Sequence, residues 1–210
     1  IVNKLKETIK YTSLDYFYDS EENFEDVYYK ISKHIVELAK EGDLVYAVPG
    51  HPRVAEKTVG IIESMAKENN IEVETIASMS FVDAMFNYLA VDPADGFKLI
   101  DAFEIENSYI DTNTSMIITQ IYDHFIASNI KLKLMEYYDY DQEVCIVNGA
   151  GVKNLESKKY VPLYELDRSE NLFNYLTSLY IPKSSKKMYN TVHDLEAIMN
   201  TLRGENGCDW

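Results

Sequence analysis

Cysteine and long apolar runs are nearly missing from this sequence. Its two cysteines are Cys145, in an apolar run, and Cys208, near the C-terminus. Two cysteines in such different contexts exclude a disulfide framework. No apolar stretch approaches the roughly 20 residues that span a bilayer, and no charged-then-apolar leader opens the chain. We therefore expect a cytoplasmic protein, in a reducing compartment, that makes no contact with a membrane.

Basic residues are also scarce. The chain has 20 Lys and Arg against 35 Asp and Glu, and its formal net charge is -15 at pH 7. This charge repels polyphosphate backbones, and the basic patch at Lys183–Lys187 is too short to override it, so nucleic acid is excluded as a partner. The 46% hydrophobic content and the 210-residue length are those of an ordinary globular protein with a substantial core.

Helices and strands are predicted to alternate in the first half of the chain. Apolar residues at three- and four-residue steps predict helices over residues 24–38, 53–67 and 81–89. Short apolar runs at Leu44–Val48 and Ile71–Ile76 predict strands that are covered on both faces. Alternation of this kind is typical of a parallel sheet.

The second half predicts a mixed sheet. A loop-rich stretch over residues 92–114 precedes a predicted strand at 116–122 and a helix at 125–135. Little helix separates the strands that follow, which indicates antiparallel pairs. These further strands are expected at 144–147, 160–163 and 179–181. A last amphipathic helix is expected over 192–202, before Gly204.

The predicted fold class is α/β with two lobes. Residues 1–112 form the first lobe, a mainly parallel sheet with helices, and residues 113–182 form the second lobe, a mixed sheet. Residues 183–210 are expected to be a linker and the start of another domain.

Three loops at strand ends are candidate ligand sites, because ligands of open α/β sheets bind at the carboxyl ends of the strands. In Val48–Pro52, two prolines stiffen the turn and Gly50 permits a positive φ. Ala77–Ser80 leads into a helix N-terminus, and Asn148–Gly151 follows a strand. Each loop also has a structural alternative: a plain turn, an N-cap at Ser80, and a hairpin turn.

Other chemistry finds little support. Gly149 and Gly151 have no third glycine at Asn154, so a dinucleotide fingerprint is not supported. His51 could be a general base or a metal ligand, but no second histidine lies at ligand spacing and we predict no metal site. Neither cysteine has a neighbouring His or Asn pattern typical of a catalytic thiolate.

One continuous segment resembles a known family. Residues 42–59 read GDLVYAVPGHPRVAEKTV, and this segment is similar to the tetrapyrrole (corrin/porphyrin) methylase-like domain of MazG-type nucleotide pyrophosphohydrolases. The resemblance covers about residues 1–182 and continues through SFVDA at 80–84, ITQIY at 118–122, VPLYELD at 161–167 and LTSLYIP at 176–182. The tail from Leu195 onward looks like the first helix and loop of a MazG domain, without that domain's metal-binding carboxylates.

The resemblance implies two α/β lobes with S-adenosylmethionine in the cleft between them, contacted largely through main chain. It assigns no catalytic residue, and it implies a small-molecule methyl acceptor or a nucleotide as substrate, a homodimer, and Mg²⁺ only for the MazG portion. The cofactor-binding candidates carried over from the family are Gly50, His51, Val54, Ser80, Phe81, Tyr122, Ala150 and Thr177.

The sequence departs from the family pattern at three places. The usual glycine-rich loop of the first strand, Gly-x-Gly-Pro-Gly-Asp, is not found, and we expect the chain to begin downstream of it. The family generally has Asp where His51 stands, although His is typical of the MazG-fused branch. Ala77-Ser78 replaces the usual Pro-Gly.

Two functions remain open from the sequence. The first is an S-adenosylmethionine-dependent methyltransferase whose acceptor is unknown. The second is a non-catalytic cofactor-binding or structural module that regulates an attached nucleoside triphosphate pyrophosphohydrolase. Pyrophosphohydrolase activity of these residues alone is disfavoured, because the expected carboxylate cluster lies beyond Trp210.

Overall fold

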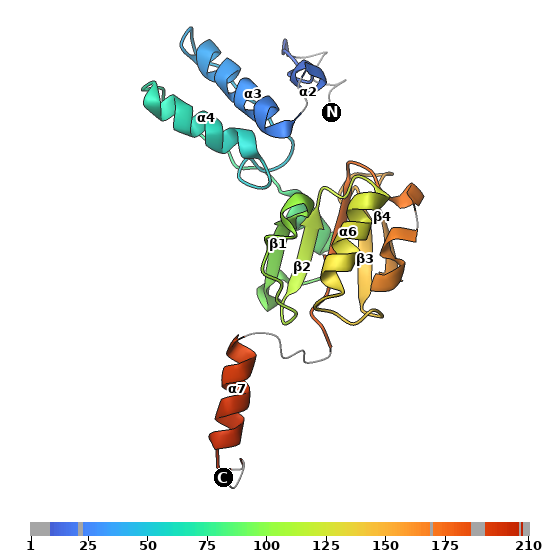
Figure 1. The fold of residues 1–210 in the computed structure, drawn as a ribbon. Helices are drawn as coiled ribbons and strands as arrows, with labels where there is room; N and C mark the ends of the chain where they lie inside the picture. Colours follow the sequence, from blue (N-terminus) through green and yellow to red (C-terminus); the bar gives the residue numbers. More distant parts are fainter. Residues whose placement is uncertain (1–8, 21–22, 169, 186–191, 206, 208–210) are drawn as a thin grey trace. The chain divides into compact units, whose positions relative to one another are not determined.

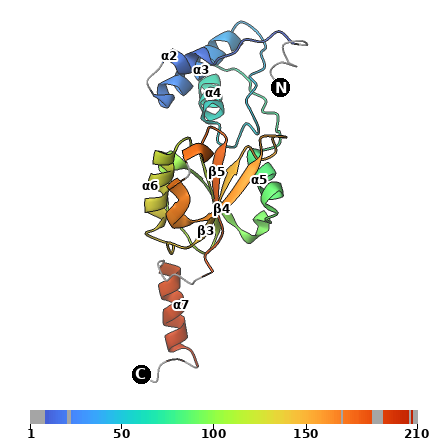
Figure 2. The same ribbon diagram turned by 90° about the vertical axis from the view of Figure 1, so that its right-hand side faces the viewer.

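The computed structural model describes residues 9–20, 23–168, 170–185, 192–205 and 207 (Figure 1 and Figure 2). The chain divides into two compact units, Ile1–Ser80 and Phe81–Trp210, and each unit is described by itself. The end of the basic patch, Lys186–Lys187, and the tail residues Cys208–Trp210 lie outside the described residues.

The described part of the first unit contains the helices α2 (Tyr16–Ser20), α3 (Phe24–Ala39) and α4 (Lys57–Glu68). The prediction of a helix over residues 24–38 is confirmed. Helix α3 begins at Asn23, whose side chain accepts a hydrogen bond from the backbone N–H of Asp26, at 2.9 Å. Helix α4 begins four residues later than predicted, because residues 51–55 form a turn in which Ala55 has a φ of 57°.

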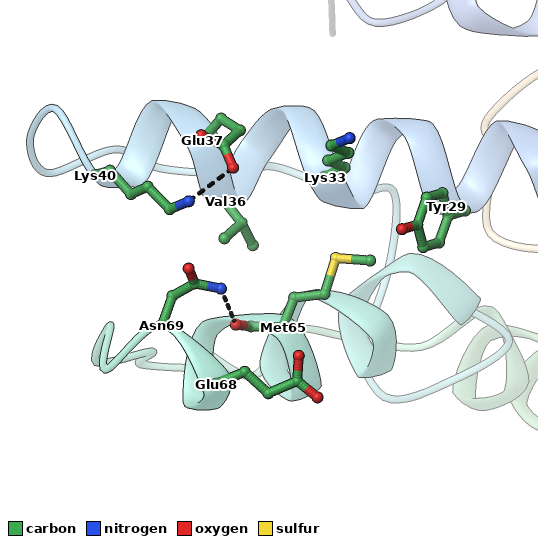
Figure 3. Close-up of a pocket in the computed structure, with 8 residues that line it drawn as sticks. All are labelled: Tyr29, Lys33, Val36, Glu37, Lys40, Met65, Glu68 and Asn69. Atoms are coloured by element: carbon green, nitrogen blue, oxygen red, sulfur yellow. Dashed lines mark hydrogen bonds and ion pairs between the residues drawn. The ribbon is translucent and has the colours of Figure 1, made fainter.

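Helices α3 and α4 pack side by side through an apolar strip. The buried residues of this strip are Val27, Ile31, Ile35, Val36 and Ile62. Figure 3 shows the C-terminal halves of both helices around a hollow of about 190 Å³, with the ion pair between Lys40 and Glu37 (2.7 Å) at one side. The hollow is smaller than ordinary small-molecule sites, which have volumes of roughly 300–1,000 Å³. We therefore do not consider it a ligand site.

The two strands predicted in the first unit are not formed. Leu44–Val48 and Ile71–Ile76 have no strand assignment and do not pair with each other. Their apolar side chains are open to solvent, with Val45 91% and Ile76 76% exposed. A strand requires a hydrogen-bonded neighbour. The apolar pattern of a segment predicts that it suits a strand, but not that a neighbour lies beside it.

The second unit is built on a five-stranded mixed sheet of order β1-β2-β5-β3-β4. Its strands are β1 (Phe97–Asp101), β2 (Ser115–Thr119), β3 (Glu143–Asn148), β4 (Ser157–Pro162) and β5 (Thr177–Ile181). Strands β1 and β2 are parallel, whereas β5 runs antiparallel to β2 and β3, and β4 runs antiparallel to β3. The α/β fold class and the mixed sheet predicted for the second half are confirmed.

Helices cover both faces of this sheet. Helix α5 (Phe81–Leu89) and helix α6 (His124–Leu134) lie on opposite faces (Figure 2). The main core lies on the α6 side, where Ile118, Ile146 and Leu179 of the central strands are fully or almost fully buried.

The short helices of the unit are η1 (Pro93–Asp95), η2 (Ala102–Glu104), η3 (Leu163–Arg168) and η4 (Glu170–Leu172). Helix α7 (Val192–Arg203) forms where the sequence predicts it.

Strand β1 was not expected, since it lies within the stretch predicted as loop-rich, residues 92–114. It pairs with β2 from Phe97 opposite Ser115 to Asp101 opposite Thr119. This pairing attaches residues 97–101 to the second unit, whereas the sequence suggests a boundary between lobes after residue 112. The contacts of the chain divide it at Ser80.

Candidate functional site

The strand directions bring polar residues to one edge of the sheet. Since β1, β2 and β3 run in one direction and β4 and β5 run opposite to them, three carboxyl ends and two amino ends meet at this edge. The residues there are Asp101, Thr119, Gln120, Asn148, Ser157 and Thr177. We call this set the polar edge. It is the position at which open α/β sheets bind their ligands.

Thr177 and Asn148 fix the centre of the polar edge. The Thr177 hydroxyl donates to Oδ1 of Asn148 at 2.7 Å, and Nδ2 of Asn174 donates to the same oxygen at 3.0 Å. The amide of Asn148 donates in turn to the carbonyl of Leu172 at 3.0 Å. Thr177 is buried. Its side chain, predicted to contact a cofactor, therefore holds the loop before β5 in place.

Gln120 and Tyr122 form the next part of the edge. Nε2 of Gln120 donates to Oδ2 of Asp101 at 2.7 Å, and the hydroxyl of Tyr122 donates to Oε1 of Gln120 at 2.6 Å. Gln120 has a φ of 64°, in the left-handed region that non-glycine residues rarely adopt. Strained backbone of this kind persists where the surrounding structure imposes it, often at functional sites.

The ring of Tyr122 belongs to an aromatic cluster. Its centroid lies 6.1 Å from that of Phe103 and 5.2 Å from that of Tyr175. Phe103 and Tyr175 are both exposed. Tyr122 is thus the only one of the three that the sequence assigned to the site. Phe103 follows the unexpected strand β1, and Tyr175 lies in no recognised motif. No local sequence pattern therefore indicated that either residue belongs to the site.

The loop after β3 is a hairpin connection, which is one of the two alternatives predicted for it. Residues 149–156 connect the antiparallel strands β3 and β4, so the hairpin interpretation is confirmed. Gly149 and Gly151 have φ values of 55° and 79°. A Cβ atom on Gly151 would lie 2.8 Å from Cβ of Ala84. Helix α5 therefore approaches this loop closely, and Phe81, one turn before Ala84, lies on the same side of α5 as Ala84. Ala150 and Phe81 belong to neighbouring segments.

The other predicted residues lie in the first unit. Gly50 has a φ of 80°, and a Cβ atom there would lie 3.8 Å from the carbonyl oxygen of Met79. The loops Val48–Pro52 and Ala77–Ser80 are therefore adjacent within the first unit. Ser80 is buried and Val54 is half-buried.

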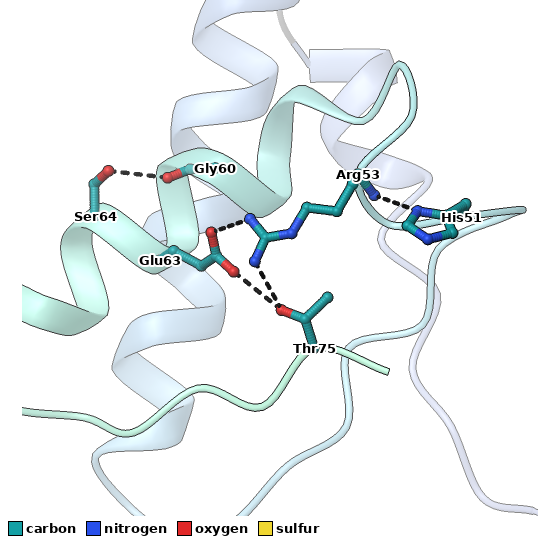
Figure 4. A network of polar contacts seen from close by, with 6 residues as sticks. All are labelled: His51, Arg53, Gly60, Glu63, Ser64 and Thr75. Carbon is teal, nitrogen blue, oxygen red and sulfur yellow. Dashed lines mark hydrogen bonds and ion pairs between the residues drawn. The ribbon is translucent and has the colours of Figure 1, made fainter. Parts of the chain in front are cut away.

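His51 has a structural role in its loop (Figure 4). Its Nδ1 accepts a hydrogen bond from the backbone N–H of Arg53, at 3.0 Å. The Arg53 guanidinium donates to Glu63 at 2.6 Å and to Thr75 at 3.5 Å. The hydrogen bond from Arg53 holds the pKa of the half-buried Glu63 carboxyl below its usual value. A ring nitrogen thus takes the acceptor position that an Asp oxygen takes in an Asx-turn.

This role of His51 leads to a prediction. Replacing His51 by Ala removes the acceptor for the Arg53 N–H, and we expect a loss of about 0.5–1 kcal/mol in the free energy of unfolding of the first unit, measured by urea denaturation. Replacement by Asn keeps an acceptor at the same place and should restore most of that loss. Equal losses in H51A and H51N would contradict the assigned role.

Titratable and metal-binding groups give no further site. Burial raises the pKa of the Cys145 thiol, which makes it a poor nucleophile. Among the described residues, no group of three or more His, Cys, Asp or Glu side chains is placed to hold a metal ion. In the same ranges, no helix combines the length and the apolar character that crossing a membrane requires.

A mixed sheet whose carboxyl edge carries polar and aromatic side chains is typical of α/β proteins that bind small ligands at that edge. The family of Tetrapyrrole (Corrin/Porphyrin) Methylases matches residues 2–167, and the chain belongs to this family. The resemblance seen in the sequence is confirmed at this level.

One relative and several solved structures are similar to the chain. The uncharacterized protein YabN of Bacillus subtilis (strain 168) is 42% identical over 207 residues, which cover 98% of this chain and 42% of that protein. The chain thus spans less than half the length of this relative.

Two solved structures show the same fold at low identity. Diphthine synthase matches with a TM-score of 0.61 at 16% identity, over 83% of this chain and 71% of that chain. Uroporphyrin-III C-methyl transferase from Thermus thermophilus, complexed with S-adenyl homocysteine, matches with a TM-score of 0.53 at 15% identity, over 73% and 72% of the two chains.

Proposed function

We propose that this chain binds S-adenosylmethionine and transfers its methyl group to a small molecule. The observation that carries the proposal is the polar edge with its aromatic cluster, at the end of a sheet whose family consists of methylases. The Thermus thermophilus enzyme of the same fold was solved with S-adenyl homocysteine, the product that S-adenosylmethionine leaves after methyl transfer.

The residues of the edge suit such a ligand. The left-handed backbone at Gln120, directly after β2, turns main-chain groups out of the regular strand direction at the polar edge, where such groups can bind polar groups of a ligand. The ring of Tyr122 offers an aromatic face for the adenine base. Methyl transfer from a sulfonium needs alignment of the acceptor more than an acid or base. A site without a catalytic triad therefore fits this reaction.

Tyr122 provides the test of cofactor binding. We expect Tyr122→Ala to weaken the binding of S-adenosylhomocysteine about fivefold, because one stacking face is worth roughly 1 kcal/mol. Tyr122→Phe keeps the ring and removes the hydrogen bond to Gln120, so it should have a smaller effect. Isothermal titration calorimetry measures both, and Tyr29→Ala on helix α3 is the control. Wild-type protein that binds neither cofactor form would exclude the proposed function.

A second function is compatible with the length of the relative, since more than half of the Bacillus subtilis protein lies outside the match. In this alternative the domain does not transfer methyl groups but regulates an attached MazG-type pyrophosphohydrolase. The full-length protein distinguishes the two. Turnover of methyl-labelled S-adenosylmethionine supports the first, whereas cofactor binding that changes nucleotide hydrolysis without methyl turnover supports the second.

A further inference from the structure

One stretch of the first unit is rich in both aromatic and acidic residues. Residues 11–29 contain seven Tyr and Phe, six Asp and Glu, and no Lys or Arg. The whole chain of 210 residues has 17 Tyr and 8 Phe, so this short stretch holds more than a quarter of them. The proposed methyl transfer makes no use of it.

Three rings of this stretch lie in a row on the helices α2 and α3. The ring centroid of Tyr18 on α2 lies 6.5 Å from that of Phe24 on α3, and the Phe24 centroid lies 6.2 Å from that of Tyr28. We call these three residues the aromatic row. Figure 2 shows α2 beside α3. The row therefore combines rings from two helices of the first unit.

The aromatic row is open to solvent. Phe24 is 50% exposed, Tyr18 is 47% exposed, and Tyr28 is partly exposed. Single apolar residues on a surface are ordinary, but neighbouring exposed rings commonly mark a surface that binds a partner, and aromatic residues are enriched in such interfaces. A solvated start of a helix would require the carboxylates of this stretch, but not its rings.

Carboxylates lie beside the row. Glu25 precedes Tyr28 by three residues on α3, so these two side chains are neighbours. Partial burial and the nearby carboxylates of Glu56 and Asp15 raise the pKa of the Tyr18 phenol, so both carboxylates lie near that ring. In the described part of the chain, no Lys or Arg forms an ion pair with Asp15, Glu25 or Glu56. Rings flanked by such carboxylates favour a cationic group.

Arginine suits this surface better than lysine. Its planar guanidinium stacks on an aromatic ring and forms two parallel hydrogen bonds to a carboxylate, whereas the Lys ammonium is a strongly hydrated point charge. In an extended chain, side chains at alternate positions point to the same side and are roughly 6.6 Å apart. This spacing matches the 6.5 and 6.2 Å between the rings of the row.

We propose that the aromatic row and its carboxylates bind an extended segment of a partner protein that carries Arg at alternate positions. The guanidinium groups stack on the rings of the row and pair with the carboxylates of Asp15, Glu25 and Glu56. The net charge of -15 attracts such a basic segment. The proposal does not rest on the polar edge, which belongs to the second unit.

Peptide binding to the whole chain tests the proposal. The probe is rhodamine-labelled Gly-Arg-Ser-Arg-Ser-Arg-Gly with a C-terminal amide, and binding is measured by fluorescence anisotropy. We expect saturable binding that weakens at high salt, because salt screens the ion pairs.

Three further peptides separate the features of the probe. The peptide Gly-Arg-Arg-Arg-Ser-Ser-Gly has the same composition and charge but a different spacing, and Gly-Lys-Ser-Lys-Ser-Lys-Gly has the same spacing but no guanidinium. Both should bind at least about threefold more weakly. A peptide with citrulline in place of each Arg keeps the shape without the charge and should show no saturable binding.

Variants locate the binding at the row. Phe24→Ala removes the central ring and should weaken binding of the Arg peptide about fivefold, and Ala suits the helix. Glu25→Gln keeps the rings and removes one charge, so it should weaken binding about twofold at low salt and less at high salt. The matched controls are Tyr109→Ala, at an exposed ring of the second unit, and Glu41→Gln, at an exposed carboxylate after α3. Both controls should leave the affinity unchanged.

Five results would overturn the proposal. The first three are no saturable binding of the Arg peptide at millimolar concentration, equal binding of the citrulline peptide, and unchanged affinity in both Phe24→Ala and Glu25→Gln. The fourth is self-association of the chain in analytical ultracentrifugation that Phe24→Ala abolishes, which would assign the row to a second copy. The fifth is displacement of the Arg peptide by S-adenosylmethionine, which would assign the row to a small cation.

Discussion

Replacing Gly151 by Ala is expected to lower the free energy of unfolding by about 2–6 kcal/mol and to abolish cofactor binding. Two costs add at this position. The φ of 79° disfavours any side chain by roughly 1–3 kcal/mol. The new Cβ atom would also lie 2.8 Å from Cβ of Ala84, and relieving such an overlap costs about 1–3 kcal/mol. Urea denaturation followed by circular dichroism measures the loss.

A double-mutant cycle separates the two costs. Ala84→Gly removes the atom that the new side chain meets, so G151A together with A84G should lose less than the sum of the single changes. Gly96→Ala is the matched control, because Gly96 has a φ of 86° but a Cβ there would meet only the Thr114 side chain, at 3.6 Å. Strict additivity of G151A and A84G would show that helix α5 does not press against this loop.

Replacing Lys131 by Met is expected to cost about 2–3 kcal/mol, because it leaves the Asp167 carboxylate without its partner in a largely buried place. Lys131 and Asp167 join helix α6 to η3 through an ion pair of 2.6 Å, with side chains only 17% and 18% exposed. Lys40→Met is the control, since its ion pair with Glu37 is exposed to solvent and its loss should change the stability far less.

The dependence of stability on pH tests the same pair. Burial by itself raises the pKa of Asp167, but the hydrogen bonds from Lys131 and Ser128 outweigh it and hold the pKa below its usual value. The unfolded pKa of Asp is about 3.9. The contribution of the pair is therefore complete above that pH and is lost as the pH falls toward the lower folded pKa. K131M should lose this acid-induced decrease, and an unchanged pH profile would contradict the assignment.

Much of the second unit could be predicted from its sequence. Ile117 and Ile146 lie in short apolar runs bounded by turn residues, and such runs form buried strands wherever a neighbouring strand is available. Here β2, β3 and β5 give each other that neighbour. The ladder partners of a segment depend on distant residues. The same kind of run at Leu44–Val48 therefore stays unpaired, and β1, with its weaker pattern, is paired.

The candidate site could be predicted only in part. Tyr122, Ala150 and Thr177 were assigned through the family resemblance, and the structure places them at the polar edge or in the loop beside it. Asp101, Gln120 and Tyr175 were missed. Their positions depend on the strand order and on a left-handed residue that no local pattern indicates. How these residues bind a cofactor stays a prediction.

The sequence alone determined the α/β class, the helices α3, α5, α6 and α7, and the turn at Val48–Pro52, because periodicity and turn chemistry act between residues that are near in the chain. The tertiary structure determined which residues each of these segments contacts. It brought Gln120 to Asp101 and Gly151 to Ala84, gave His51 a structural hydrogen bond, and left Leu44–Val48 and Ile71–Ile76 unpaired where strands were predicted. Contacts between distant segments depend on strand order and close packing, and these are properties of the whole fold rather than of any stretch of sequence.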